Sequence, residues 1–233
     1  MTNKEMPFGE SVEMYLKTIA ELSNLRELVP ITSIAERLGI STVSASEMVH
    51  RLQDHGLLRH TPYKGVQLTK HGARTANMVI RNHRLWERFL VDKLGIAWES
   101  VNEHACRLEH AVDDDVIEAL ADFLEHPQTC PHGNPIPDSE GKMPRVAGEQ
   151  LLDFAAGESG VILRILPNDD YDILCAYLAA RGIKPGERLT VEEIAPFDGP
   201  ISIRLGENVH ALGRKMAQQI MLKREKKFVE AAA

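Results

Sequence analysis

Apolar side chains recur at helical spacing through the first 75 residues, with short polar breaks between the stripes. From residue 11 to about Asn24 they share one stripe, which predicts a helix, and Met14 falls on the opposite side of it. A shorter stripe predicts a second helix at residues 31–38. Gly39 then supplies a turn, and Ser41 is a favourable N-cap for a third helix that ends near His55.

The third predicted helix has an apolar inner face and a small, polar outer face. A helix, a glycine turn and such a helix are typical of a helix-turn-helix, and a predicted hairpin at residues 57–69 with a basic tip follows. The order of elements favours a winged helix that binds double-stranded DNA; the alternative is a small helical packing module. Arg59 and Lys64 would neutralise phosphates, and Glu47 could accept from a cytosine amino group. The candidate DNA contacts are Thr42, Val43, Ser44, Ser46, Glu47 and His50 on the helix, and Arg59 and Lys64 on the wing.

A long helix is predicted at residues 70–94, where His83 and Glu87 stand one turn apart beside apolar side chains. A histidine on an apolar face is often an ordinary core residue, but here a carboxylate one turn away could share a cation with it. A further helical segment at residues 101–125 would complete a pair. Such an apolar pair commonly serves as a two-fold dimer interface.

Three ligand types lie close together in that second segment. On a helix, residues three and four apart are neighbours, so Cys106, Glu109 and His110 would share one patch of surface. A thiolate, a carboxylate and an imidazole at this spacing are typical of a site for a transition-metal ion. Any acidic helix with a cysteine and a histidine can imitate this pattern, so its neighbours must support the interpretation.

Five prolines between residues 126 and 144 mark a domain boundary. Cys130-Pro-His132 lies in this stretch, and as an isolated pair in a proline-rich loop it is assigned to the linker. Beyond it the pattern changes to strands. We expect strands at residues 160–166, 188–192 and 201–205, a helix at residues 171–180, and a stretch at residues 209–221 ending in a short helix. The predicted fold class is mainly α with a small β domain.

Composition narrows the choice of function. The 233 residues carry a net charge of −7, but the imbalance is local: residues 101–140 hold one arginine against ten acidic side chains. An acidic middle suits cations rather than polyanions. Three unevenly spaced cysteines, no signal peptide and no apolar run long enough for a bilayer together predict a cytoplasmic protein with no membrane partner.

Four motifs, in this order, resemble the diphtheria-toxin-repressor family of metal-dependent transcriptional regulators. They are Ser11-Val-Glu-Met14-Tyr-Leu with the helix-turn-helix after it, His83-Arg-Leu-Trp-Glu87-Arg-Phe-Leu, Glu103-His-Ala-Cys106-Arg-Leu-Glu109-His110, and Gly133-Asn-Pro-Ile-Pro137. The resemblance covers about residues 8–140. The C-terminal pattern is similar to the small SH3-like barrel of the ferrous-transport protein A family.

The resemblance implies a homodimer on operator DNA with two metal sites per subunit, filled by Fe(II) or Mn(II). One site would use His83 and Glu87 with further ligands, and the other would use Met14, Cys106, Glu109 and His110. Similar iron sensors carry a histidine at the position of Asn102, so Asn102 offers only a neutral oxygen to the first site. Acids from the last domain reach back to that site in larger members, which makes Asp169 and Asp170 candidates. Two sulfur ligands favour Fe(II), with Mn(II) close behind.

The predicted domains are a winged helix-turn-helix at residues 1–75, a helical metal-binding and dimerisation domain at residues 76–140, and an SH3-like domain at residues 145–225. The predicted function is a metal-dependent repressor of metal-ion homeostasis. The chief alternative is a DNA-binding protein with a structural zinc site that does no sensing. A metallohydrolase is disfavoured, since no His-Glu-x-x-His and no nucleophile triad is found in the sequence.

Overall fold

The computed structural model describes residues 9–23 and 28–225. The chain forms two compact units. Within the described residues, the first unit is built from Met1–Trp86, Cys106–Phe123 and Ile136–Pro144. The second unit is built from Glu87–Ala105, Leu124–Pro135 and Arg145–Ala233. The predicted end of the first helix, near Asn24, lies outside the described residues.

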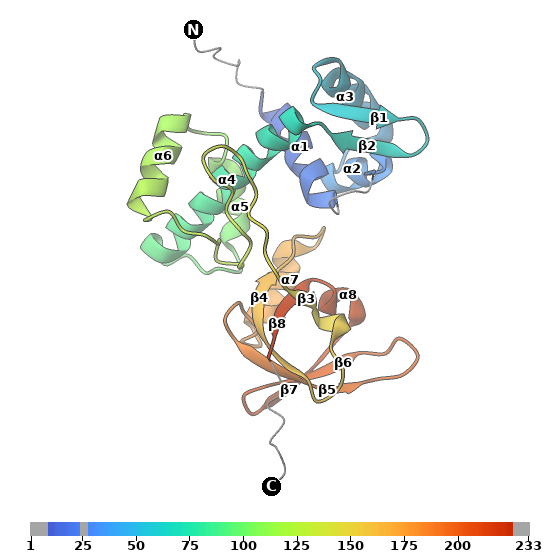
Figure 1. The fold of residues 1–233 in the computed structure, drawn as a ribbon, viewed down its shortest axis with the longest axis vertical. Coiled ribbons are helices and arrows are strands. Elements are labelled where there is room, and N and C mark those ends of the chain that lie inside the picture. Colours follow the sequence, from blue (N-terminus) through green and yellow to red (C-terminus); the bar gives the residue numbers. More distant parts are fainter. Residues whose placement is uncertain (1–8, 24–27, 226–233) are drawn as a thin grey trace. The chain divides into compact units, whose positions relative to one another are not determined.

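Helices α1 (Glu10–Leu22), α2 (Ile31–Leu38) and α3 (Thr42–Asp54) form the predicted helix-turn-helix (Figure 1). Gly39 closes α2 in the left-handed region at φ 66°, as the glycine turn requires. The Ser41 hydroxyl accepts a hydrogen bond from the backbone N–H of Ser44, which confirms the N-cap and stabilises α3 by about 1 kcal/mol. The apolar faces of the three helices meet in one core, which includes Leu16, Ile19, Ile34, Ala45, Val49 and Leu52.

The wing consists of two antiparallel strands, β1 (Leu58–Thr61) and β2 (Gly65–Leu68), in the register Leu58 to Leu68. Val66 also exchanges backbone hydrogen bonds of 2.8 Å with Val29, just before α2. Gly65 permits this approach, because a Cβ at its position would lie 2.4 Å from the Val29 carbonyl oxygen. Tyr63 at the wing tip is fully exposed and has φ 61°.

The middle of the chain differs from the expected helical pair. Helix α4 (Lys70–Leu94) has its predicted bounds, but the segment after it is two helices, α5 (Val101–Leu108) and α6 (Asp114–Phe123). Asp113, Asp114 and Asp115 start a new helix, because aspartate is favoured at a helix N-terminus and disfavoured in an interior. Glu109 and His110 therefore lie in the turn after α5, and the prediction that they share one helix with Cys106 is wrong.

The last part of the chain forms an antiparallel sheet of six strands in the order β3-β8-β4-β5-β6-β7. Their bounds are β3 (Glu149–Gln150), β4 (Ser159–Ile165), β5 (Arg188–Ile194), β6 (Ile201–Leu205), β7 (Asn208–Leu212) and β8 (Ile220–Arg224). A 3-10 turn at Leu151–Asp153, helix α7 (Tyr171–Ala179) and helix α8 (Arg214–Ala217) complete the domain (Figure 1).

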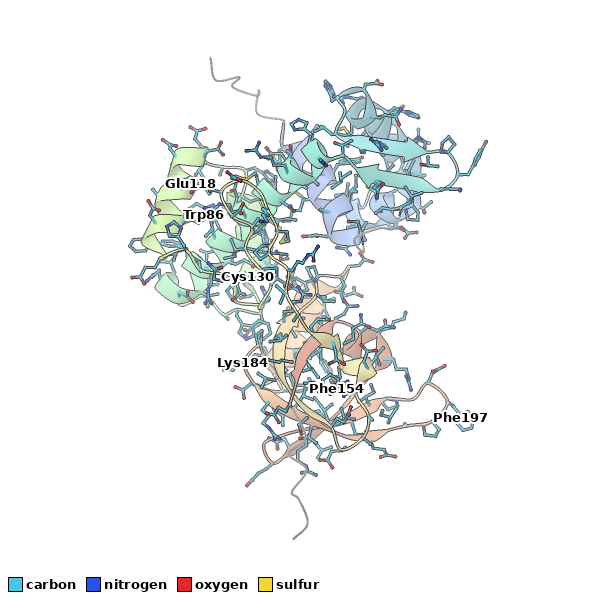
Figure 2. The ribbon with its side chains drawn as sticks, in the orientation of Figure 1. Trp86, Glu118, Cys130, Phe154, Lys184 and Phe197 are labelled. Carbon is cyan, nitrogen blue, oxygen red and sulfur yellow. The ribbon has the colours of Figure 1, made fainter. Side chains whose placement is uncertain are left out.

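The small β domain was predicted correctly, but its sheet is not a closed barrel. β3 and β7 stand at opposite ends of the strand order and do not pair in the described chain. The expected single stretch at residues 209–221 is divided among β7, α8 and β8. The β5–β6 hairpin ends in Phe197, whose side chain is fully exposed (Figure 2). Among the described helices, none is both long and apolar enough to cross a bilayer.

Candidate metal centres and DNA-binding surface

A buried cluster in the first unit brings together side chains from α1, α4, α5 and the turn after α5. The ligand atoms of His83, Cys106 and Glu109 all lie within 4.8 Å of one another. His83 Nδ1 is 2.6 Å from Glu109 Oε2 and 3.9 Å from Cys106 Sγ. His83 and Glu109 are buried, and Cys106 is half-buried. We call these three residues, together with His110, the first cluster.

The amine of Lys17, on α1, lies in the first cluster. Its Nζ donates to both carboxylate oxygens of Glu109, at 2.6 and 2.9 Å, and lies 3.1 Å from His83 Nδ1 and 3.8 Å from Cys106 Sγ. The Lys17 side chain is only 7% exposed and the Glu109 side chain is fully buried. The amine therefore contacts the same three donors that a metal ion would use, and acts as a stand-in cation.

His110 connects the cluster to α1 a second time. Its Nδ1 lies 2.5 Å from Oε2 of Glu13, and its Nε2 lies 3.2 Å from Oε1 of Glu109. Glu13 and Lys17 are one turn apart on α1, on the side of the helix that also carries half-buried Met14. Neither Glu13 nor Lys17 was identified from the sequence.

The charges of the cluster stabilise one another. Burial alone would raise the pKa of Glu109, but hydrogen bonds from His110 and His83 and the charge of Lys17 hold that pKa well below its usual range. Burial opposes the charged form of Lys17, yet the Glu109 carboxylate prevails and raises the pKa of the amine. Contact with Glu109, and then with Glu13, raises the pKa of His110. Without metal, the buried Glu109 carboxylate is therefore compensated by the Lys17 ammonium and by its contacts with His83 and His110.

A second cluster lies in the second unit and consists of Glu87, Cys130 and His132. His132 Nδ1 is 3.0 Å from Glu87 Oε1 and 3.9 Å from Cys130 Sγ. Cys130 is labelled in Figure 2. All three residues are buried, and the His132 ring packs edge-on against Trp98 at 5.4 Å between centroids. In the described part of the chain, His132 Nε2 is buried with no hydrogen-bond partner.

The two clusters divide the ligands differently from the sequence analysis. The sequence predicts His83 and Glu87 in one site, whereas the structure places His83 beside Cys106 and Glu109, and Glu87 beside Cys130 and His132. The Cys130–His132 pair had been assigned to the linker. A signal was present in the sequence, since cysteine and histidine are both ligands of transition-metal ions.

The remaining predicted ligands lie outside both clusters as described. Asn102 is half-buried on α5, and Asp169 and Asp170 are exposed just before α7. His104, two residues before Cys106, is exposed.

Both clusters fit a divalent transition-metal ion by the chemistry of their donors. Each combines a sulfur, a carboxylate and imidazole nitrogen, with two imidazoles in the first cluster and one in the second. Such a mixture binds Zn(II), Fe(II) and related ions and is too soft for Mg(II) or Ca(II). In the first cluster, the donor atoms already surround a positive charge, the ammonium of Lys17.

The predicted DNA-binding side chains lie at the surface of the first unit. Thr42, Val43, Ser44, Glu47 and His50 are exposed along α3, Ser46 is half-buried, and Arg59 and Lys64 are exposed on the wing. Val43 is 69% exposed and therefore accessible to a partner at this surface. The His50 ring meets the His60 ring of β1 edge-on, so α3 and the wing share one surface.

Comparison with known proteins assigns this arrangement to a family. Residues 7–66 match the iron dependent repressor N-terminal DNA binding domain, and residues 69–138 match the iron dependent repressor metal binding and dimerisation domain. The iron-dependent repressor IdeR of Mycobacterium leprae is 36% identical over 227 residues, covering 92% of this chain and 97% of that protein. The chain belongs to the iron-dependent repressor family. Residues 150–224 match the FeoA domain, so this repressor also carries the predicted C-terminal module.

Other relatives place the repressor among both iron and manganese regulators. The diphtheria toxin repressor of Corynebacterium diphtheriae is 39% identical over 129 residues, 55% of this chain and 57% of that protein. A manganese-dependent transcriptional repressor in complex with manganese superimposes with a TM-score of 0.83 at 35% identity, covering 92% of this chain and all of that one. A structure of ScaR with bound Zn²⁺ gives a TM-score of 0.81 at 29% identity, covering 92% of this chain and 99% of that one.

Proposed function

We propose that this repressor senses a divalent metal ion at the first cluster and binds operator DNA in response. One observation carries the proposal: the cluster that offers metal ligands contacts α1, the first helix of the DNA-binding module. Lys17 and Glu13 of α1 contact Glu109 and His110 from the turn after α5. A change of charge at the cluster must therefore act directly on the DNA-binding helices.

We propose Cys106, Glu109, His110 and His83 as the ligands of the first cluster, with Met14 as a further sulfur donor from α1. The distances among His83, Cys106 and Glu109 support this set, as does the contact of His110 with Glu109. Met14 is half-buried on the same side of α1 as Lys17. A bound divalent ion would supply two positive charges between α1 and α5. The ligands of α1 and of the turn would then be held more firmly than by the single charge of Lys17.

The Glu87–Cys130–His132 cluster is the proposed second site. Asn102, Asp169 and Asp170 were predicted as further ligands of a site with His83 and Glu87, and they stay candidate ligands beside Glu87. A fully buried sulfur, imidazole and carboxylate set is typical of a site that stabilises the fold. This burial favours, for the second cluster alone, the alternative of a structural metal that does no sensing.

Fe(II) and Mn(II) are the proposed effectors of the first cluster. The Cys106 thiolate and the Met14 thioether favour Fe(II), because oxygen donors suit Mn(II) better. IdeR of Mycobacterium leprae is named as iron-dependent, and the structural relative with a TM-score of 0.83 is named as manganese-dependent. The donors of the first cluster are thus compatible with either Fe(II) or Mn(II).

The proposed form on DNA is a homodimer. Val116 and Phe123 are exposed on α6, at 44% and 60%, where a two-fold partner could cover them. α3 would enter the major groove, while Arg59 and Lys64 would contact phosphates. We place the protein in the cytoplasm, where free cysteines such as Cys106 persist.

The test is operator binding by the purified metal-free protein. A fragment selected from random-sequence DNA by the Mn(II)-loaded protein is titrated at fixed salt with no metal, Fe(II), Mn(II) or Zn(II). We expect Fe(II) or Mn(II) to raise affinity about 5- to 150-fold, corresponding to a coupling of roughly 1–3 kcal/mol. Cys106→Ala should abolish this increase. Affinity that is unchanged by chelator would instead support a structural metal, and equal affinity for random DNA would exclude specific regulation.

A further inference from the structure

We propose that Lys17 is a built-in competitor of the metal ion and sets the metal concentration at which this repressor responds. The inference rests on the proposed function of the first cluster. It begins with the position of one atom: Lys17 Nζ lies between 2.6 and 3.8 Å from donor atoms of Glu109, His83 and Cys106.

The ammonium and a metal ion cannot share this place. Metal ions bind sulfur, imidazole and carboxylate ligands at about 2.0–2.3 Å, so an ion among these three donors would lie within a few ångström of Nζ. Both would be positive, and the Glu109 side chain that balances them is fully buried. Repulsion between like charges at this distance in a buried site is strong. The ammonium must therefore leave when the ion enters.

The ammonium of Lys17 can move from Glu109 to other carboxylates on its own helix, α1. Glu13 lies one turn before it and Glu21 one turn after it on α1, and both are only partly buried. Carboxylates four residues away on a helix are within reach of a lysine ammonium. The long, flexible stem of lysine allows such a movement, whereas the planar fork of arginine would exchange partners less readily.

Two consequences follow for the sensor. In the metal-free protein Lys17 keeps Glu109 compensated and forms one of the two charged contacts between α1 and the turn after α5. The ion must then displace an existing ion pair rather than fill open space, which weakens its apparent affinity. Lys17 would thus keep the repressor from responding to traces of metal.

The first experiment measures Mn(II) affinity of the purified metal-free protein from the electron paramagnetic resonance signal of free Mn(II). Lys17→Met removes the charge and keeps an unbranched side chain that is one atom shorter, and we expect at least tenfold tighter binding of one equivalent. Lys184→Met, which alters an exposed lysine of the second unit (Figure 2), should leave the isotherm unchanged. Equal or weaker binding by a folded Lys17→Met protein would overturn the inference, since Lys17 would then merely position Glu109.

The second experiment uses the unmodified protein, because Lys17→Met could unfold when Glu109 loses its counter-charge. Lysines are labelled by reductive methylation, and the extent at each position is read by mass spectrometry with and without saturating Mn(II). We expect Lys17 to be protected without metal and labelled with it. Lys17 that stays protected in the Mn(II)-bound protein would contradict the proposal.

Cys106→Ala separates this inference from the proposed function. If that variant binds one equivalent of Mn(II) less than the unmodified protein, the first cluster is a metal site, and the two experiments above judge Lys17 alone. If the variant binds the same number of equivalents as the unmodified protein, both the proposed metal site and the proposed competition by Lys17 are contradicted.

Discussion

Glu13 Oε2 on α1 lies 2.5 Å from Nδ1 of His110, which is 97 residues further along the chain. This contact joins the first helix of the DNA-binding module to the turn that follows α5. Together with the Lys17–Glu109 pair it makes two charged connections between these segments in the absence of metal. Both connections involve residues that are also proposed ligands, so metal binding and the position of α1 depend on the same atoms.

Removing the Glu13 charge should be visible at His110. In the metal-free protein, Glu13→Gln should lower the pKa of His110, because one of the two carboxylates that raise it is lost. The pKa is measured from the imidazole C–H shifts in a pH series by nuclear magnetic resonance. Glu10→Gln, an exposed change on the same helix, is the control and should leave the His110 pKa unchanged. An unchanged pKa in Glu13→Gln would show that the contact does not form in solution.

The second cluster should affect stability rather than sensing. Cys130→Ala should reduce the bound Zn(II) by one equivalent and abolish the rise in Tm that Zn(II) produces in the second unit, while DNA binding should still respond to metal through the first cluster. Stoichiometry is measured by elemental analysis after dialysis, and Tm by calorimetry. Cys175→Ala, which also removes a buried thiol, should retain both equivalents. Loss of the DNA response in Cys130→Ala would assign sensing to this cluster as well.

Arg59 should contribute to DNA affinity without contributing to sequence preference. Arg59→Ala removes one exposed charge from the wing, so the slope of log affinity against log salt should fall in magnitude by about 0.9. The loss of affinity should be similar for selected and random DNA. Fluorescence anisotropy at several salt concentrations measures both quantities. A loss confined to the selected sequence would indicate base contact by Arg59 instead.

Cys175 should make the folded state less stable in alkaline solution. Burial raises the pKa of this thiol from 9.0 to about 12. Between these values the unfolded chain loses the thiol proton and the folded chain keeps it, so the free energy of unfolding falls as pH rises above 9. From pH 8 to pH 10 the unmodified protein should lose about 1.4 kcal/mol more than Cys175→Ala. Urea denaturation at both pH values measures this difference, and equal losses would mean that the thiol is accessible to water.

Much of the fold could be predicted because its elements depend on local pattern. Helical periodicity located α2 and α4 at their observed bounds, and Gly39 and Ser41 marked the turn and the cap between α2 and α3. The break between α5 and α6 was missed because apolar residues keep their helical phase across it. Phase alone gave too little weight to the three successive aspartates. Closure of the sheet could not be judged, since it depends on pairing between strands far apart in the sequence.

The candidate sites were predicted only where their ligands are close in sequence. Cys106, Glu109 and His110 lie within five residues, and the structure keeps them together although two of them leave the helix. The grouping of His83 with these residues rather than with Glu87 depends on tertiary packing. Lys17 was overlooked for a similar reason: a lysine is normally exposed, and only its partner 92 residues away explains its burial.

The hydrogen bonds between Val29 and Val66 bear on how this repressor can move on DNA. They join β2 of the wing to the chain just ahead of α2. Because α2, α3 and the wing also share one core, the wing and α3 form a single block. Reorientation of that block would carry the predicted DNA-contacting side chains of α3 and Arg59 of the wing together. Metal binding would then change the position of α3 and the wing together over the DNA duplex, while the distance between α3 and the wing stays fixed.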